Sequence, residues 1–283
     1  MKIQYWGTAA AEGVPGIFCC CDVCKAARLK KGRCIRTRSQ IMINDDLLVD
    51  FGPDTYMHSL QYDFDLSRLE HVIITHPHED HFYPDEITNR MPSFAKEQGA
   101  PTLIIHGAEE TLHTIRNVVQ GIKHYKNQNR VLFDIMKEYE TRKIGDYMVT
   151  PLPARHGTKT PFNYLIEDGE TSFLVLNDTG RPASEVYEYL SSRNIVLDAI
   201  SFDTTFGYEN SLAKYGVSDH HMGLLDNVAV REYMILCGIA DKNTVCIANH
   251  FSHQGVDADY DTMCERAEGY GFEVSYDGMT LEV

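Results

Sequence analysis

Short apolar runs bounded by turn residues recur along the chain and alternate with segments of helical periodicity. The turns Asn44-Asp45-Asp46 and Asp168-Gly169-Glu170 each join two such runs into a predicted hairpin. Many strands with interspersed helices favour an α/β (α+β) fold with packed sheets in the middle and helices outside. We expect strands at residues 2–6, 40–44, 46–50, 71–75, 102–106, 147–151, 162–167, 172–176, 197–202, 245–249, 272–276 and 279–283, and helices at 109–119, 182–193, 222–237 and 257–269.

The chain is expected to form a single domain, 1–283, because no repeat, low-complexity segment or Pro/Ser-rich linker divides it. Residues 86–145 are rich in polar side chains and include Lys123-His124-Tyr125-Lys126-Asn127, so we expect a surface excursion near the functional site. No run approaches the length of a membrane span, and the first seven residues lack the apolar core of a secretory signal. The cytoplasm is therefore the expected location.

Acidic residues outnumber basic ones, and the formal net charge is −15. Such a chain repels polyanions at long range unless its basic residues are segregated. The densest basic stretch runs from Lys25 to Arg38. A solvated helix face is the first interpretation of it, and a phosphate-facing edge is the alternative. Long nucleic acid is therefore disfavoured as a partner, although bound cations would offset part of the acidity.

Residues 76–81 read His-Pro-His-Glu-Asp-His and follow directly after the strand predicted at 71–75. Three imidazoles and the Asp80 carboxylate in one short loop suit borderline divalent cations, which lower the pKa of bound water to about 7. A solvated, His-rich turn is the alternative. The pattern His-x-His-x-Asp-His resembles the signature of the metallo-β-lactamase superfamily.

Three further polar side chains stand just beyond predicted strands: His156, Asp178 and His250. Strand ends of this kind are where α/β folds build sites, although each residue alone is more simply a hydrogen-bonded loop residue. A two-metal centre needs about seven protein ligands, and the order of these three matches the superfamily. The ligand types permit zinc, manganese or iron. The resemblance implies His76, His78 and His156 on one metal, Asp80, His81 and His250 on the second, and Asp178 bridging both.

Four of the eight cysteines lie within six positions, at Cys19, Cys20, Cys21 and Cys24. Disulfides within so tight a cluster are geometrically poor, and Cys-x-Cys-x-x-Cys is typical of a zinc site. With His253 as fourth ligand, Cys19, Cys21 and Cys24 would form a closed tetrahedral site, and Cys20 would be a spare thiol. The choice among Cys19, Cys20 and Cys21 is less determined than that of Cys24. A redox cluster beside a hydrogen-bonded His253 is the alternative.

Further motifs recur along the chain: Gly13-Val14-Pro15, Pro151-Leu152-Pro153 to His156, Phe162 with Tyr164 and Leu165, Asp178-Thr179, His250-Phe251-Ser252-His253-Gln254 and the stretch from Gly271 to Met279. Through these motifs the chain resembles one branch of the superfamily, the PhnP-type phosphodiesterases, nearly from end to end. The resemblance implies a four-layer αββα fold, two active-site metal ions (manganese or zinc) and a remote structural zinc. It also implies hydrolysis of phosphodiesters, small cyclic ribose phosphates among them. Phe82-Tyr83-Pro84 and the long segment 86–145 depart from the family pattern, and we expect both to touch the substrate pocket.

Two residues are expected to take part in catalysis, Asp80 and His221. The family has a non-ligand catalytic histidine where Ser218-Asp219-His220-His221 opens a predicted helix. His221 matches this position best, His220 is the reserve, and a histidine that caps the helix start is the alternative. Asp203-Thr204-Thr205-Phe206 follows another strand and is expected to line the pocket, with Thr204 or Thr205 as a candidate donor to phosphate or part of a structural turn.

Four other functions compete with this hypothesis. The acidic charge and the lack of a basic arm disfavour an RNA-processing nuclease. The near-complete ligand set disfavours a non-phosphodiester role like that of PQQ-biosynthesis relatives, which share a similar cysteine cluster. The bridging Asp178 and the cysteines count against a β-lactam hydrolase, and His221 beside seven ligands counts against a non-catalytic binding protein. The expected partner is a small phosphodiester substrate. The oligomeric state, a homodimer included, is left open by the sequence.

Overall fold

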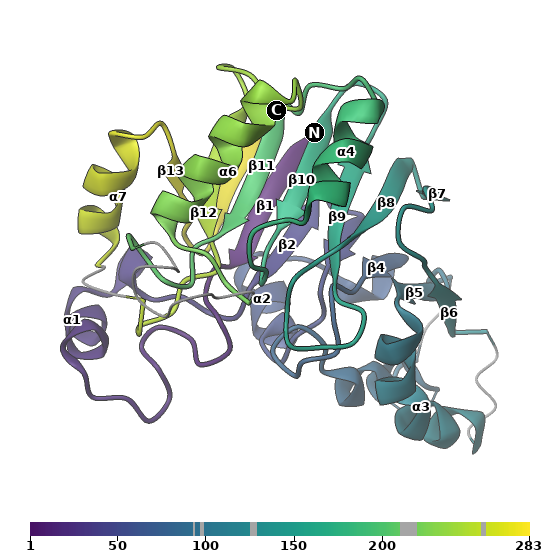
Figure 1. The fold of residues 1–283 in the computed structure, drawn as a ribbon. Coiled ribbons are helices and arrows are strands. Elements are labelled where there is room, and N and C mark those ends of the chain that lie inside the picture. Colours follow the sequence, from purple (N-terminus) through teal and green to yellow (C-terminus); the bar gives the residue numbers. More distant parts are fainter. Residues whose placement is uncertain (93, 97–98, 125–128, 210–219, 256–258) are drawn as a thin grey trace.

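Two seven-stranded sheets pack face to face and carry helices on both outer faces (Figure 1). The computed structural model describes residues 1–92, 94–96, 99–124, 129–209, 220–255 and 259–283. Its four layers confirm the αββα fold expected from the sequence. Within the described part of the chain, no helix is both long and apolar enough to cross a membrane.

The first sheet comes from the N-terminal half of the chain and includes the last strand of the protein. Its strands β3 to β6 run parallel, whereas β14, β1, β2 and β3 pair antiparallel. The carboxyl ends of β3 and β4 therefore lie at the same edge. In pairing order the strands are β14 (Met279–Glu282), β1 (Lys2–Gly7), β2 (Gln40–Ile43), β3 (Leu47–Val49), β4 (His71–Ile73), β5 (Leu103–Gly107) and β6 (Val131–Ile135).

The second sheet comes from the C-terminal half. Strands β10 to β13 run parallel, and β7, β8, β9 and β10 pair antiparallel, so β8, β10, β11 and β12 all point the same way. Their carboxyl ends meet at one edge of the sheet. In pairing order the strands are β13 (Glu273–Val274), β12 (Val245–Asn249), β11 (Ala199–Asp203), β10 (Ser172–Leu176), β9 (Phe162–Glu167), β8 (Tyr147–Pro153) and β7 (Arg142–Ile144).

Three apolar clusters hold these layers together. Tyr5 and Ile43 of the first sheet pack against Phe173 and Val175 of the second, so the central strands are buried on both faces. This double burial explains why their sequences are continuous apolar runs. Helices α4, α6 and α7 cover the outer face of the second sheet, and α3 lies on the first (Figure 1). The helices are α1 (Asp22–Lys30), α2 (Thr55–Gln61), α3 (Glu109–His124), α4 (Ser184–Ser192), α6 (Leu224–Leu236) and α7 (Tyr260–Glu268), with short 3₁₀ turns η1 (Gly32–Cys34), η2 (Leu66–Arg68) and η3 (Pro84–Arg90).

The polar segment 86–145 is more regular than the sequence suggested. Its described residues form β5, α3, β6 and β7, which belong to the two sheets and the helix layer rather than to a surface excursion. Strand β6 was missed because it is an edge strand: Leu132 and Ile135 are each 44% exposed, so the run lacks a clean alternation. Residues 125–127 of the stretch from Lys123 to Asn127 lie outside the described residues.

The basic stretch from Lys25 to Arg38 is not one solvated helix face. Helix α1 ends at Lys30, and Arg36 beyond it is buried. The Arg36 guanidinium donates to Thr8 Oγ1 at 2.8 Å and to the Ser275 carbonyl at 2.7 Å. Arg38 pairs with Asp54 at 3.1 Å. The prediction was wrong for this second half, because these arginines join distant loops instead of facing solvent or phosphate.

Candidate metal centre

Imidazole and carboxylate side chains from both sheets meet where the carboxyl ends of β4, β8, β10 and β12 converge. Strand ends at one edge are where α/β folds place ligands, and this topology brings together residues that are far apart in sequence. The loop after β4 contributes most of the set, and each of the other three strands contributes one side chain. The members are His76, His78, Asp80, His81, His156, Asp178 and His250.

A first group consists of His76, His78, His156 and Asp178, whose ligand atoms all lie within 4.8 Å of one another. His78 Nδ1 is 2.9 Å from His76 Nε2 and 3.1 Å from His156 Nε2, so three ring nitrogens converge on one point. Burial lowers the pKa of His76 and lowers the pKa of His156 to about 4. Both rings are therefore neutral near pH 7, the form that binds a metal ion.

A second group consists of Asp80, His81, Asp178 and His250, again with ligand atoms within 4.8 Å of one another. Asp178 Oδ2 lies 3.1 Å from His76 Nε2 and 3.2 Å from His81 Nε2, so this carboxylate stands between the two groups. Burial alone would raise the pKa of Asp178, but the imidazoles around it, that of His250 above all, hold the pKa well below its usual range. An ionised carboxylate shared by two groups has the place of a bridging ligand.

Several buried polar atoms at this centre lack a hydrogen bond from any described residue, which is costly unless a cation satisfies them. They are His81 Nε2, His250 Nε2 and Asp178 Oδ1. Burial would lower the pKa of His81, yet the Asp80 and Asp50 carboxylates raise it well above its usual value, which reflects an excess of negative charge here. Imidazole nitrogens and carboxylate oxygens are donors that Zn²⁺ and Mn²⁺ accept. The residues therefore fit divalent cations.

The strand ends at the centre have an unusual backbone. Asp50, Asp178 and His250 have φ values of 67°, 53° and 60°, a left-handed conformation that non-glycine residues rarely adopt. Such strain concentrates at functional sites. Gly52 allows the metal loop to approach closely, since a Cβ at this position would lie 2.2 Å from the Asp80 carbonyl oxygen. The backbone is thus shaped to turn these side chains inward.

Asp50, which sequence reasoning did not single out, orients His81. Its Oδ2 lies 2.7 Å from His81 Nδ1, and its Oδ1 accepts hydrogen bonds from the Thr75 backbone N–H and hydroxyl at 2.8 and 2.9 Å. A carboxylate on one ring nitrogen fixes the tautomer and leaves the other nitrogen for a metal ion. The available signal was the one that identified Asp178: a lone aspartate at the end of an apolar strand, here just before Phe51-Gly52.

Asp203, expected only to line the pocket, is a second orienting carboxylate. It is fully buried at the end of β11, and its Oδ2 lies 3.2 Å from His221 Nδ1 and 3.4 Å from His250 Nδ1. The backbone N–H groups of Met222 and Thr205 each donate to its Oδ1 at 3.0 Å. Asp203 therefore ties the loop that carries His221 to the strand end that carries His250.

The structure separates the neighbouring histidines His220 and His221. His221 is 24% exposed, and its Nδ1 lies 3.1 Å from Asp178 Oδ1. Burial would lower the pKa of His221, but Asp203 and Asp178 raise it to about 10. The His220 side chain is exposed, and its backbone carbonyl accepts a hydrogen bond from His156 Nδ1 at 3.2 Å. His221 is therefore the histidine that faces the centre, while His220 orients His156 through its backbone.

A cavity of about 430 Å³ opens onto the centre. Thr205 lines it as expected, and its hydroxyl lies 2.8 Å from His250 Nδ1, whereas Thr204 is fully buried and bonded to Asn227. The described lining consists of Ala10, Ala11, Glu12, His78, Asp80, His156, Asp178, Thr205, Phe206, His221, His250, Ser252 and Gln254.

The expectation that Phe82-Tyr83-Pro84 and segment 86–145 touch the pocket was wrong for the described residues. None of them lines the cavity. Phe82 is instead fully buried in the core beneath the outer face of the first sheet, where it forms a β-bridge with Phe51. An aromatic ring directly after the metal loop thus anchors that loop to the core.

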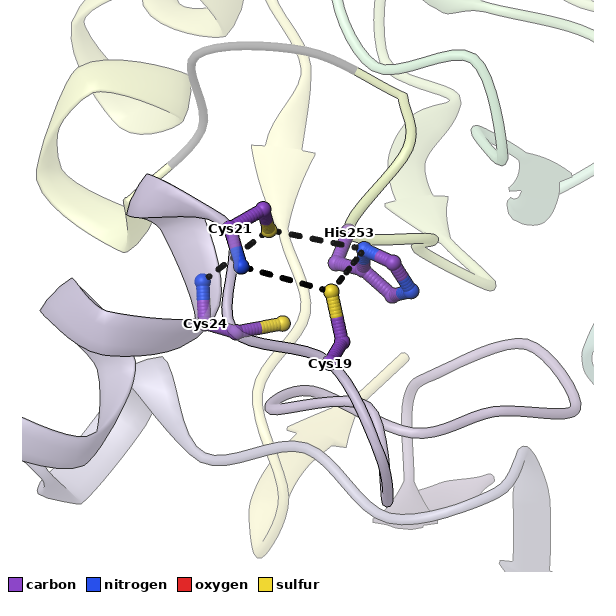
Figure 2. Close-up of side chains that lie close together, drawn as sticks. All are labelled: Cys19, Cys21, Cys24 and His253. Carbon is purple, nitrogen blue, oxygen red and sulfur yellow. Dashed lines mark hydrogen bonds between the residues drawn. The ribbon is translucent and has the colours of Figure 1, made fainter.

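Figure 2 shows Cys19, Cys21, Cys24 and His253 pointing toward one another. Their ligand atoms lie within 4.8 Å, and His253 Nδ1 is 3.6 Å from Cys19 Sγ and 3.7 Å from Cys21 Sγ. The backbone N–H of Cys24, at the start of α1, donates to Cys21 Sγ and lowers the pKa of that thiol to about 6, whereas burial raises the pKa of Cys24 to about 11. Cys20 is exposed and outside the group. Three thiols and an imidazole are a donor set for tetrahedral zinc.

The family model described as "Beta-lactamase superfamily domain" matches residues 46–235, and the chain belongs to this family. The predicted metallo-β-lactamase superfamily is thereby confirmed. The superfamily consists mostly of metal-dependent hydrolases, and the chain has the fold together with candidate His/Asp metal sites. No curated protein matches the chain by sequence.

Solved structures share the fold over the whole chain. A diphosphatase from the PhnP family has 20% identity and a TM-score of 0.75, and the match covers 100% of this chain and 98% of that one. Zn²⁺-bound PqqB from Methylobacterium extorquens has 18% identity and a TM-score of 0.73, with full coverage of both chains. The short form of human tRNase Z has 13% identity and a TM-score of 0.64, covering 100% and 99%. At these identities the similarity shows the fold alone.

Proposed function

We propose that this protein is a metal-dependent phosphodiesterase of the PhnP type that cleaves small phosphodiesters, cyclic ribose phosphates among them. The observation that carries the proposal is the joint arrangement of two His/Asp groups that share Asp178 and of His221 at one cavity, which His221 and members of both groups line. Two adjacent cation sites with an acid group beside them suit hydrolysis of a phosphate ester. The motifs shared with the PhnP-type family support the narrower assignment.

In this proposal each group would hold one ion, manganese or zinc, and Asp178 would be a ligand common to both because it belongs to both groups. When bound, the two cations would lower the pKa of a water molecule and neutralise charge on the phosphate oxygens. The chain itself supplies the orientation: Asp50 fixes His81, Asp203 and Thr205 fix His250, and the His220 carbonyl fixes His156. Asp80 acts as a ligand and keeps its carboxylate ionised, because the His81 imidazole lowers its pKa against the effect of burial.

His221 is proposed as the general acid. Its Nδ1 faces the carboxylates of Asp178 and Asp203, which stabilise the protonated ring. Nε2 is then the atom that donates a proton to the oxygen that leaves phosphorus. A positioned acid of this kind contributes roughly 10²–10⁴-fold to a rate.

The cysteine cluster is proposed to hold a structural zinc ion through Cys19, Cys21, Cys24 and His253. His253 follows His250 by three residues, so a closed site there would tie the N-terminal loop to the strand end that presents His250. A tetrahedral site with four protein ligands has no position for substrate, which suits a structural role.

The deciding experiment measures initial rates on bis(p-nitrophenyl) phosphate with protein stripped of metal and reloaded with manganese. We expect metal-dependent turnover, and we expect His221→Ala to lower it by about 10²-fold or more without changing the metal content. His113→Ala, at an exposed position of α3, is the matched control.

Three results would contradict all or part of the proposal. Absence of turnover with two bound metal ions verified would favour a non-phosphodiester role on the same fold. Normal turnover of the His221→Ala variant would reject the acid role of His221 alone. Preferential cleavage of a tRNA precursor over small diesters would instead favour the nuclease alternative.

A further inference from the structure

An ion pair outside the candidate metal centre joins two of the segments that build it. Arg181 lies three residues after Asp178, and Asp226 lies five residues after His221. Arg181 Nε and Nη2 both donate to Asp226 Oδ1, at 2.9 and 2.7 Å. The pair therefore connects the segment that presents the shared carboxylate to the segment that presents the candidate acid.

The Asp226 carboxylate is buried and uses both of its oxygens. It lies in the first turn of α6, is 0% exposed, and its Oδ2 accepts a hydrogen bond from the Gly223 backbone N–H at 3.0 Å. A buried carboxylate is costly unless it is paired and hydrogen-bonded. The start of α6 is also confined, because a Cβ on Gly223 would lie 1.7 Å from the Glu209 carbonyl oxygen. Asp226 thus holds the start of the helix with one oxygen and Arg181 with the other.

Residues 178–181 are also bonded to the strand end that carries His156. The Arg155 backbone N–H donates to Thr179 Oγ1 at 2.9 Å, and the Gly180 backbone N–H donates to the Arg155 carbonyl at 2.8 Å. These bonds fix the segment on the side of β8. The ion pair fixes it on the side of α6, so the segment is held between two neighbouring loops.

His221 depends on its neighbours for its position. Next to it, the Met222 backbone N–H donates to Asp203 Oδ1, and the Phe206 backbone N–H donates to the Met222 carbonyl, both at 3.0 Å. The following residue, Gly223, is bonded to the buried carboxylate of the ion pair. A general acid must be aligned with the reacting atoms, and a misplacement of about 1 Å can cost roughly 10²-fold in rate. Two carboxylates, that of Asp203 and that of the pair, therefore restrict the loop of His221.

We propose that the ion pair of Arg181 and Asp226 positions His221 relative to Asp178, so that the candidate acid and the shared carboxylate keep one arrangement at the cavity. The inference rests on the proposed phosphodiesterase function and adds two positioning residues to it. Neither of these two described residues lines the cavity. The pair therefore acts through the segments it joins and not by contact with substrate.

The test separates positioning from stability with two variants. Arg181→Met removes the guanidinium and leaves the buried carboxylate unpaired, which should lower both the stability and the rate. Arg181→Met combined with Asp226→Asn also removes the unpaired charge, whereas the amide oxygen can still accept the hydrogen bond from Gly223. In this double variant the melting temperature should return toward that of the wild type, while the rate stays low.

The rates are measured on two substrates that differ in the leaving group. The ribose oxygen released from uridine 2′,3′-cyclic phosphate is strongly basic and needs a proton, whereas the phenolate released from bis(p-nitrophenyl) phosphate needs it much less. For both variants we expect kcat on the cyclic nucleotide to fall roughly tenfold or more, with KM and metal content nearly unchanged. The loss on the p-nitrophenyl ester should be smaller by a factor of about three or more.

Two further variants serve as controls. Arg193→Met breaks a comparable ion pair, between Arg193 and Glu167 at 2.9 Å, at the opposite edge of the second sheet, and should keep both rates. Arg181→Lys keeps a charged donor. Because both donors of the arginine reach the same oxygen, one ammonium can replace them, and kcat should stay within about threefold of the wild-type value.

Each outcome decides the role of the pair. Wild-type kcat on the cyclic nucleotide in the double variant would show that the pair contributes to stability alone and would overturn the proposal. Equal losses on the two substrates would also overturn it, because they would not depend on the proton that His221 donates. If the wild type hydrolyses neither substrate, the phosphodiesterase function fails, and hydrogen exchange of the Met222 amide then decides the role of the pair. Faster exchange in the double variant than in Arg193→Met would support that role, and equal exchange would overturn it.

Discussion

The His/Asp centre and the cysteine cluster are two candidate metal sites only a few residues apart along the chain, at His250 and His253, yet they are built differently. The centre collects imidazoles and carboxylates, leaves three buried polar atoms without hydrogen bonds from the described residues and opens onto a cavity of about 430 Å³. The cluster collects three thiols and one imidazole, with the backbone N–H groups of Gly16 and Cys24 donating to sulfur.

The comparison indicates how the type of donor and the access of substrate distinguish a candidate catalytic metal centre from a candidate structural one. Open coordination next to a cavity permits substrate to reach a metal ion, whereas four protein donors close a site. The orienting shell also differs: Asp50, Thr205 and Asp203 direct the rings of the centre, whereas Glu12 contacts His253 at the cluster. Substitutions at the centre should therefore affect rate, and substitutions at the cluster should affect stability.

The largest effect is expected for Asp178→Asn. The substitution keeps the size of the side chain but removes the charge shared by both ligand groups, so both metal ions should be lost in part and turnover should fall by roughly 10³-fold. Elemental analysis and initial rates measure the two quantities. Asp63→Asn, exposed and also at positive φ, is the control. Full metal content and normal rates in Asp178→Asn would contradict the proposal that Asp178 is a ligand of both metal ions.

The next effect concerns the cluster. Cys24→Ser should remove one equivalent of zinc and lower the melting temperature, because metal binding at a closed site adds directly to folding free energy. Cys20→Ser is a matched control in the same loop, because Cys20 is exposed and outside the group. Equal zinc loss in both variants would contradict the conclusion that Cys24 is a zinc ligand and Cys20 is not.

A smaller effect is expected for Asp50→Asn at the centre. The variant loses the charge that orients His81. Substitution of such an orienting partner typically lowers metal affinity or activity by about 10- to 100-fold. Metal titration followed by initial rates distinguishes the two losses. A change in melting temperature without either loss would place Asp50 in a purely structural role.

The smallest effect lies outside both sites. His58 is buried and bonded to Thr37 and Gln40, and burial lowers its pKa to about 4. Since the unfolded chain binds this proton near pH 6.5, the folded state loses stability as the pH falls from about 6.5 toward 4. In urea unfolding of the metal-free protein, the free energy of unfolding should fall between pH 7 and pH 5 by about 2 kcal/mol less in His58→Gln than in the wild type. Equal losses would exclude His58 as a source of acid sensitivity.

How much the sequence predicted differs between the buried central strands and the half-exposed elements of the fold. The strands of the second sheet at 162–167, 172–176 and 245–249 agree with the structure because burial on both faces produces an unbroken apolar run. Edge strands β6 and β7 and the short helix α2 were missed, because half-exposed elements carry weak periodicity. Asp50 and Asp203 were not recognised as orienting groups for the same kind of reason: one aspartate after a strand has many local explanations.

The sequence by itself indicated the superfamily, the four-layer fold and the residues of both candidate ligand clusters, because closely spaced cysteines and ligand-type side chains after apolar strands are local features. Only the tertiary structure showed that His221 and not the His220 side chain faces the centre, that Phe82 is buried away from the cavity and that Glu12 lies on the cavity wall. Those outcomes depend on which strand ends and loops meet in space. Such contacts join residues far apart in the chain, so their direction and distance are set by packing and not by local pattern.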